Sequence, residues 1–157
     1  MNRRIFAISI IVFAIDQITK NVLSVILTIN EDIIMIKDFF YITLINNYGA
    51  AWSMMQNMTP IIIVGSIIAL IIIYRYMYSF KMNKKNIIAF GLLTGGILGN
   101  LIDRIFQGYV IDFLNFHIFG YNFPVFNFAD IAIVIGVVLL IWAILKVEDK
   151  KHETREK

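Results

Sequence analysis

The sequence of 157 residues has no cysteine, only two histidines and two prolines, and only 16% charged residues. The absence of cysteine excludes disulfides, thiolate catalysis, thiolate metal ligands and lipid attachment to cysteine. His117 and His152 do not have the spacing of a metal-ligand pair, so we expect no metal site and no cofactor. Because an ordinary soluble domain carries about 25% charged residues, the low charge content points to a protein embedded in a membrane.

Long hydrophobic runs take the place of charge, and 59% of the residues are hydrophobic. A helix that crosses a bilayer needs about 20 apolar residues. Four segments meet this length, and we expect transmembrane helices at about 5–27, 60–78, 86–106 and 129–145. The N-terminus is basic and then apolar, as in a signal peptide, but no small-residue cleavage site follows it, so we expect an uncleaved first span. The sequence thus predicts a single integral membrane domain over residues 1–157.

Lysine and arginine gather on one side of these predicted spans. They precede the first span, occupy the loop between the second and third, and follow the fourth, whereas the opposite side has only Lys37. By the positive-inside rule, both termini are expected in the cytoplasm. The net charge of +3 is therefore a signal of topology. No basic stripe interleaved with aromatic residues favours a nucleic-acid partner.

The two predicted outer loops are rich in β-branched and aromatic residues. The stretch "FFYITLIN" (39–46) favours a strand, and "LNFHIFGYNFPVF" (114–126) is aromatic and broken by glycine and proline. We expect a small extracytoplasmic sheet or hairpin at the headgroup level, where aromatic side chains are favoured. The expected fold class is an all-α membrane protein with four transmembrane helices and a small extracytoplasmic β element.

The predicted topology brings the polar residues of the spans to one level, near the outer interface. The residues concerned are Asp16 and Lys20 in the first span, Asn100, Asp103 and Arg104 at the end of the third, Asp112 just after it, and Asn127 and Asp130 at the start of the fourth. Charges at membrane depth cost roughly 2.5–3.5 kcal/mol each on insertion scales, so they persist mostly when they pair or function.

Each of these residues also has a purely structural interpretation. Asp16 and Lys20, four apart on a helix, can form an intrahelical ion pair. Asp103 and Arg104 can anchor the third span through a partner on another helix, and Asn100 can form an interhelical hydrogen bond. Asn127 can cap the fourth helix, with Asp130 as a favourable first-turn carboxylate, and Asp112 can be a surface charge of a loop.

Asp112 and Asp130 lie on either side of one loop that must return to the same depth. Two carboxyl groups held close in a site of low dielectric do not both ionise easily, so one keeps its proton. Such a pair can hydrolyse a peptide bond without a metal: the ionised member activates water and the protonated member donates to the carbonyl oxygen. An amide such as Asn47 and a cation such as Arg104 could then orient the substrate or bind the developing oxyanion.

Five motifs along the chain are similar to those of one family, in the family's order. They are "DQITK" (16–20), "NYGAAWS" (47–53), "GGILGNLIDR" (95–104), "VIDF" (110–113) and "FPVFNFAD" (123–130). Together they resemble the bacterial lipoprotein signal peptidase family, also called signal peptidase II. The resemblance implies an intramembrane aspartic endopeptidase that removes the signal peptides of diacylglyceryl-modified prolipoproteins and cleaves before the lipid-modified cysteine.

The resemblance also implies roles for individual residues. Asp112 and Asp130 match the catalytic pair. The expected substrate-binding positions are Asn47, Gly49, Asn100, Arg104 and Asn127, and the expected supporting positions are Asp16, Lys20, Asp103 and Trp52. Trp52 and its loop could form a cradle or lid over the bound peptide.

The same resemblance implies a monomer in the bacterial cytoplasmic membrane, with its site near the extracytoplasmic face and with sensitivity to cyclic peptides of the globomycin type. Two other classes remain open from the residues alone. Intramembrane carboxylates also serve ion-coupled transporters, which place polar residues at the midplane, whereas the inner halves of these four spans are apolar. A non-catalytic membrane subunit is the other alternative.

Overall fold

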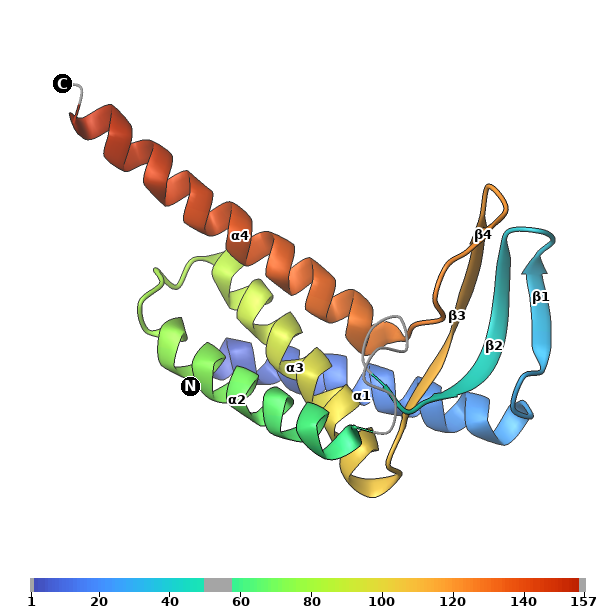
Figure 1. The fold of residues 1–157 in the computed structure, drawn as a ribbon. Coiled ribbons are helices and arrows are strands. Elements are labelled where there is room, and N and C mark those ends of the chain that lie inside the picture. The colour runs from blue at the N-terminus through green and yellow to red at the C-terminus, as the bar shows by residue number, and fades with distance from the viewer. Residues whose placement is uncertain (1, 50–57, 156–157) are drawn as a thin grey trace.

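The computed structural model describes residues 2–49 and 58–155, with side chains up to residue 146. It contains four long helices, α1 (Arg3–Ile26), α2 (Thr59–Met77), α3 (Lys84–Phe106) and α4 (Phe128–Arg155). Each has a stretch long and apolar enough to cross a membrane, and each lies over one of the predicted spans. In Figure 1, α1 and α3 run toward the end of the molecule that carries the sheet, and α2 and α4 run away from it.

Helix α3 is the centre of the bundle. In the most apolar 18-residue stretch of α3, 67% of the residues are buried, whereas in that of α2 only 6% are. Glycine makes this central position possible, because a Cβ added to Gly96 would lie 2.5 Å from the carbonyl oxygen of Ala129 at the start of α4. Helices in membranes associate largely through such close backbone contacts, since lipid supplies no hydrophobic driving force between them. Helix α2 exposes isoleucines and Val64 over most of its length, as expected of a helix that faces lipid.

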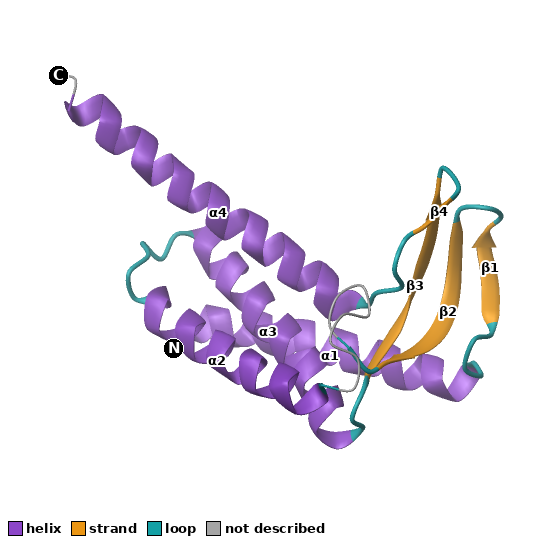
Figure 2. Ribbon diagram, viewed as in Figure 1, coloured by secondary structure: helices purple, strands orange, loops and turns teal. Residues whose placement is uncertain are grey.

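Four strands form one antiparallel sheet at the far end of the bundle, in the order β1 (Asp32–Ile36), β2 (Phe40–Asn47), β3 (Val110–Ile118) and β4 (Tyr121–Asn122). Figure 2 shows the sheet standing beside the ends of the helices and not between them. The predicted fold class, four apolar helices with a small β element, is therefore confirmed. The predicted strand at 39–46 corresponds to β2, whereas β1 was not predicted.

The base of the sheet is fastened to the bundle by apolar contacts. Ile111 of β3 and Leu44 of β2 form a buried cluster with Leu27, the residue after α1. Farther out, the ring of Phe116 stacks on that of Phe40 with centroids 4.5 Å apart. The strands β2 and β3 therefore leave the bundle with fixed inner ends, and these ends carry the polar residues described below.

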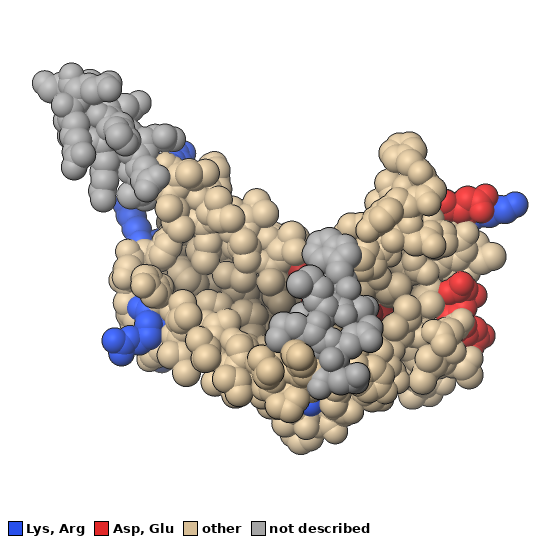
Figure 3. Space-filling view, in the orientation of Figure 1, with Lys and Arg blue, Asp and Glu red and all other residues tan. Residues whose placement is uncertain are grey.

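The two ends of the molecule differ in charge. Figure 3 shows lysine and arginine side chains gathered at the end where α2 stops and α3 starts, and mostly aspartate and glutamate among the charged side chains at the sheet end. At the basic end, the Nζ atoms of Lys85 and Lys146 lie 3.6 Å and 5.3 Å from the ring centroid of Trp142. Such cation–π contacts are typical of side chains that meet a membrane interface.

Candidate active site

Asn127 links the two aspartates that the sequence singled out. It precedes α4, and its Oδ1 accepts the backbone N–H of Asp130 at 3.0 Å, while Asp130 Oδ2 accepts the backbone N–H of Asn127 at 3.2 Å. This reciprocal pair closes the first turn of α4 in the manner of a capping box. The side-chain amide of Asn127 also donates to Asp112 Oδ1 at 2.6 Å. One fully buried residue therefore holds both carboxyl groups, one from β3 and one from α4.

Asp112 belongs to strand β3 and is only 3% exposed, so the interpretation as a surface charge of a loop is wrong. Its Oδ2 accepts a hydrogen bond of 2.8 Å from the amide of Asn47 on the neighbouring strand β2. Burial away from water, and then the negative charge of Asp130, raise the pKa of Asp112 to about 7, against hydrogen bonds from Asn47 and Asn127 that lower it. A carboxyl group with this pKa can keep its proton at neutral pH.

Asp130 lies in the first turn of α4, next to α3. The amide of Asn100, on α3, donates to Asp130 Oδ1 at 2.8 Å. The oxygen of the same amide, Asn100 Oδ1, accepts hydrogen bonds from Asn127 Nδ2 at 3.1 Å and Lys20 Nζ at 2.9 Å. Asn100 thus joins the aspartate pair to a second group of polar residues on α1.

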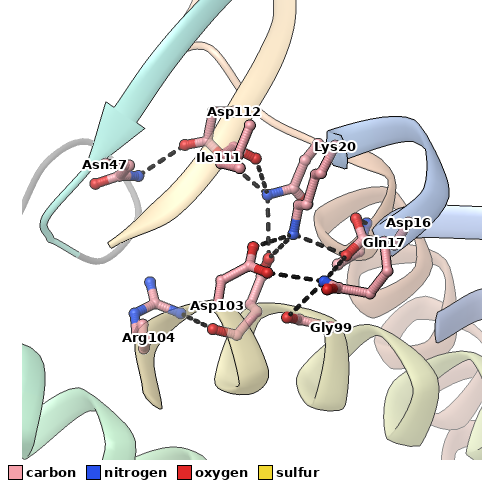
Figure 4. A network of polar contacts seen from close by, with 12 residues as sticks. Asp16, Gln17, Lys20, Asn47, Gly99, Asp103, Arg104, Ile111 and Asp112 are labelled. Atoms are coloured by element: carbon pink, nitrogen blue, oxygen red, sulfur yellow. Dashed lines mark hydrogen bonds and ion pairs between the residues drawn. The ribbon is translucent and has the colours of Figure 1, made fainter. Parts of the chain in front are cut away.

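That second group is centred on Lys20. Its Nζ lies 2.7 Å from Asp16 Oδ2 on the same helix and 2.7 Å from Asp103 Oδ2 on α3. Figure 4 shows the ammonium between the two carboxylates, and all three side chains are at most 1% exposed. The other oxygen of Asp16 accepts the backbone N–H of Ala129 at 3.0 Å, so this group also fixes the start of α4.

Gln17 completes the Lys20 group, and it was missed by the sequence analysis. Its amide donates to Asp103 Oδ1 at 2.8 Å and to the carbonyl of Gly99 at 3.3 Å. The available signal was its polarity within an apolar helix, directly after Asp16. That signal gave no direction, because the partner of an interhelical amide depends on how the two helices are rotated.

Arg104, predicted to orient substrate, is half-buried at the end of α3 and holds the backbone. Its Nη2 donates to the carbonyl of Gly49 at 2.8 Å and its Nη1 to the carbonyl of Asn100 at 3.2 Å. The amide N–H of Gly49 in turn donates to Asn47 Oδ1 at 2.9 Å. These contacts fix the end of β2 beside the aspartates. Trp52, the remaining predicted residue, lies outside the described residues.

The site is therefore assembled from α1, β2, α3, β3 and the start of α4. All the predicted residues that the structure describes take part in one connected set of contacts. The set has two parts: the aspartate pair surrounded by neutral amides, and the Lys20 group in which one cation lies between two carboxylates. A pair of carboxyls of this kind, one of them able to keep its proton, suits acid–base hydrolysis.

Comparisons with known proteins agree with this chemistry. A model of the family described as "Signal peptidase (SPase) II" matches residues 8–146. The lipoprotein signal peptidases of Staphylococcus aureus strains JH9 and Newman are each 39% identical to this chain over 151 residues, covering 96% of this chain and 93% of theirs.

Two solved structures described as bacterial membrane enzymes share the fold. The first, at 2.3 Å resolution, has a TM-score of 0.87 and 36% identity, and the match covers 96% of this chain and 93% of that one. The second, at 1.9 Å resolution, has a TM-score of 0.81 and 36% identity over 93% of this chain and 95% of that one. The comparisons give no support to a transporter or a non-catalytic subunit. The match of the family model across all four helices, together with the identity to these relatives, shows that the chain belongs to the signal peptidase II family of peptidases.

Proposed function

We propose that Asp112 and Asp130 are the catalytic pair with which this protease removes signal peptides from prolipoproteins. The reaction is supported by membership of the signal peptidase II family. The assignment of Asp112 and Asp130 as the catalytic residues is supported by the hydrogen bonds that Asn127 makes to both. Asn127 bonds to Asp112 through its side chain and to Asp130 through its backbone N–H and side-chain oxygen. No other pair of aspartates in the described chain shares such a residue without a cation between them.

The chemistry follows from one proton shared by two carboxyls. The ionised aspartate takes a proton from water as the water oxygen bonds to the carbonyl carbon of the peptide. The protonated aspartate gives its proton to the carbonyl oxygen, which produces a gem-diol. The first aspartate then protonates the amine nitrogen, the C–N bond breaks, and a hydroxyl of the gem-diol returns its proton to the second aspartate. Both carboxyls end in their starting states, so no cofactor is consumed.

The neighbouring amides would serve this reaction in two ways. Asn47, Asn100 and Asn127 donate to the carboxyl oxygens and so keep the acids in place before substrate arrives. Once the peptide displaces part of this hydrogen bonding, the same amides are available to its backbone and to the developing oxyanion. Arg104 supports the site through the carbonyl of Gly49, which lies where the first outer loop begins.

The direction of insertion follows from the charges. Lysine and arginine side chains gather at the end of the bundle where α2 stops and α3 starts, whereas acidic side chains gather at the sheet end (Figure 3). The positive-inside rule then puts the basic end and both termini in the cytoplasm, and the aspartates and the sheet at the extracytoplasmic face of the bacterial cytoplasmic membrane. A substrate anchored by a diacylglyceryl group would meet the site at that depth without leaving the bilayer.

Further expectations follow from the family. Cleavage is expected before the lipid-modified cysteine, cyclic peptides of the globomycin type are expected to inhibit it, and the enzyme is expected to act as a monomer. The decisive experiment is reconstitution of the full chain in lipid with a diacylglyceryl-modified prolipoprotein. Asp112→Asn and Asp130→Asn should each abolish cleavage while the protein still folds. Full activity in either variant would exclude this pair.

A further inference from the structure

We propose that Lys20 is a positioning residue of the aspartate pair: its ammonium fixes the side-chain amide of Asn100 so that the amide N–H groups face Asp130 and hold that carboxyl as the ionised, proton-accepting member. The inference rests on the proposed roles of Asp112 and Asp130. It assigns those roles to the individual residues, which the symmetry of a carboxyl pair alone does not do.

Three acceptors surround the ammonium of Lys20, two in ion pairs and one in a hydrogen bond. An ammonium has three N–H donors and no acceptor. Around Nζ lie three acceptors: Asp16 Oδ2 at 2.7 Å, Asp103 Oδ2 at 2.7 Å and Asn100 Oδ1 at 2.9 Å. Lys20 is 1% exposed, so water does not replace any of them. The ammonium therefore has one arrangement, in which the third donor is directed at Asn100.

The position of the Lys20 ammonium decides which way the Asn100 amide points. With Oδ1 on Lys20, the amide nitrogen must face the other side, where it donates to Asp130 Oδ1 at 2.8 Å. Asn127 Nδ2, a second donor 3.1 Å from Oδ1, favours the same orientation. A flipped amide would put N–H groups against two donors and a carbonyl oxygen against a carboxyl, so it loses every one of these hydrogen bonds.

The hydrogen bonds around the two aspartates differ in how strongly they favour the ionised carboxyl, and this difference decides which aspartate holds the shared proton. A carboxyl group that accepts N–H bonds from an amide and from the first turn of a helix is favoured in its ionised form. Asp130 accepts from Asn100 and from the backbone of Asn127, and its hydrogen-bond chain ends, through Asn100, at the cation of Lys20. Asp112 accepts only from the neutral amides of Asn47 and Asn127 among the described residues. The proton of the pair accordingly belongs on Asp112.

The reaction then has a direction. Asp130 takes the proton of water as the water oxygen attacks the peptide carbonyl, and Asp112 gives its proton to the carbonyl oxygen. Among the described residues, the charged and titratable groups that face the pair are those of α1, α3 and the pair itself: Asp16, Lys20, Asp103, Arg104, Asp112 and Asp130. A test must alter Lys20 without altering the total charge of this set.

The double variant Lys20→Met/Asp103→Asn meets that condition, because it removes one positive and one negative charge. In the full chain reconstituted in lipid, kcat for a diacylglyceryl-modified prolipopeptide is expected to fall about 10²-fold, the scale of a misplaced catalytic group. KM should stay close to wild type. The acidic limb of the kcat/KM profile should move to higher pH, because Lys20 no longer holds the Asn100 amide that favours the ionised form of Asp130. A merely structural role for Lys20 would leave that limb in place.

Ser9→Ala is the matched control. Ser9 is also buried on α1 and also bonds to α3, donating to the carbonyl of Gly91 at 3.2 Å, but it has no link to the aspartates. Its removal should leave kcat, KM and both limbs of the pH profile unchanged.

Asn100→Asp tests the same chain without touching Lys20. One carboxyl oxygen can keep the contact to Lys20, while the other replaces the N–H that faces Asp130. Activity at neutral pH should fall at least about 10²-fold and recover partly at acidic pH, where the new carboxyl gains a proton that it can donate to Asp130. This variant decides the question if the Lys20 double variant does not fold.

Three results would overturn the proposal. One is a folded Lys20→Met/Asp103→Asn enzyme whose pH profile is that of wild type. Another is a loss confined to KM. The last is an Asn100→Asp enzyme that is fully active at neutral pH. If these occur while Asp112→Asn and Asp130→Asn are inactive, the positioning role fails and the proposed function stands; if the aspartate variants are active, the proposed function itself fails.

Discussion

Two pairs of aspartates lie close together in this structure, and they differ in what lies between their members. Asp16 and Asp103 have the ammonium of Lys20 between them, 2.7 Å from each. Asp112 and Asp130 have the neutral amide and backbone of Asn127. The residue type is the same, and three of the four aspartates are buried while Asp130 is half-buried, so the intervening group is the main difference between the pairs. A cation pairs with both carboxyls and holds α1 against α3; an amide leaves one proton to be shared, and a shared proton can do chemistry.

The largest effect on activity is expected from substitutions of Asp112 and Asp130, the aspartates that have no cation between them. Asp112→Asn and Asp130→Asn each remove a proton carrier but keep the shape of the carboxyl and one of its two acceptor oxygens. We expect cleavage of a diacylglyceryl-modified peptide to fall by about 10⁴-fold or more, since both acid and base steps depend on the pair. Thermal unfolding in detergent should be unchanged or occur at a higher temperature, because a costly buried carboxyl has gone. A large loss of stability would mean that this pair is structural as well.

The converse change is Lys20→Met, which removes the cation from the other pair. Two buried carboxyls are then left without their cation, and breaking a buried ion pair in this way costs about 3–5 kcal/mol. The unfolding midpoint in a denaturant titration should fall accordingly. Lys20→Met/Asp103→Asn should restore much of that stability without restoring activity. Equal stability of the single and double variants would contradict the assignment of Asp103 as a partner of Lys20.

The dependence of the reaction rate on pH tests whether Asp112 holds the proton of the pair. Burial and the charge of Asp130 raise the pKa of Asp112 from 3.8 to about 7. As the proton donor, Asp112 must be protonated, so kcat/KM should fall by up to about tenfold per pH unit as the pH rises above about 7. The stabilisation that comes from the proton bound by folded Asp112 is fully present below pH 3.8 and is lost as the pH rises through about 7.

The check is a pair of pH series, one of initial rates and one of unfolding midpoints. Asp112→Asn removes the titrating group, so its midpoint should vary less than that of wild type between pH about 4 and about 7. A wild-type rate that stays constant well above pH 7 would show that Asp112 does not supply the proton.

The sequence allowed the helices, one strand and the members of the site to be predicted, for physical reasons that differ. A membrane helix can be recognised in a sequence because a run of about 20 apolar residues is rare outside membrane spans. The expected level of Asp112 and Asp130 along the bundle follows from counting residues along the spans. Strand β1, by contrast, has all its residues exposed and was not foreseen. Strand β1 forms because it pairs with β2, and the local sequence preference of residues 32–36 does not reveal that pairing.

The partners within the site were less accessible. The Asp16–Lys20 contact follows from a spacing of four on a helix. The contact of Lys20 with Asp103, and the role of Gln17, depend on the rotation of α1 against α3, which glycine contacts and the packing of the whole bundle determine. Sequence reasoning identified which polar residues would come together at one end of the bundle but not which hydrogen bonds they would form.

The smallest change tests how tightly the bundle holds the charged pair. A Cβ added to Gly99 would lie 2.5 Å from Asp16 Oδ2 and 3.3 Å from the Cβ of Ala129, so Gly99→Ala must displace the carboxylate or helix α4. Overpacking of this kind typically costs about 1–3 kcal/mol. Gly65→Ala on α2 is the matched control, because nothing lies within 4 Å of its added Cβ; it should leave stability unchanged or raise it by up to about 1 kcal/mol. Denaturant unfolding of both variants measures the difference. If Gly99→Ala is as stable as Gly65→Ala, Asp16 is free to move, and the Lys20 group is looser than its distances indicate.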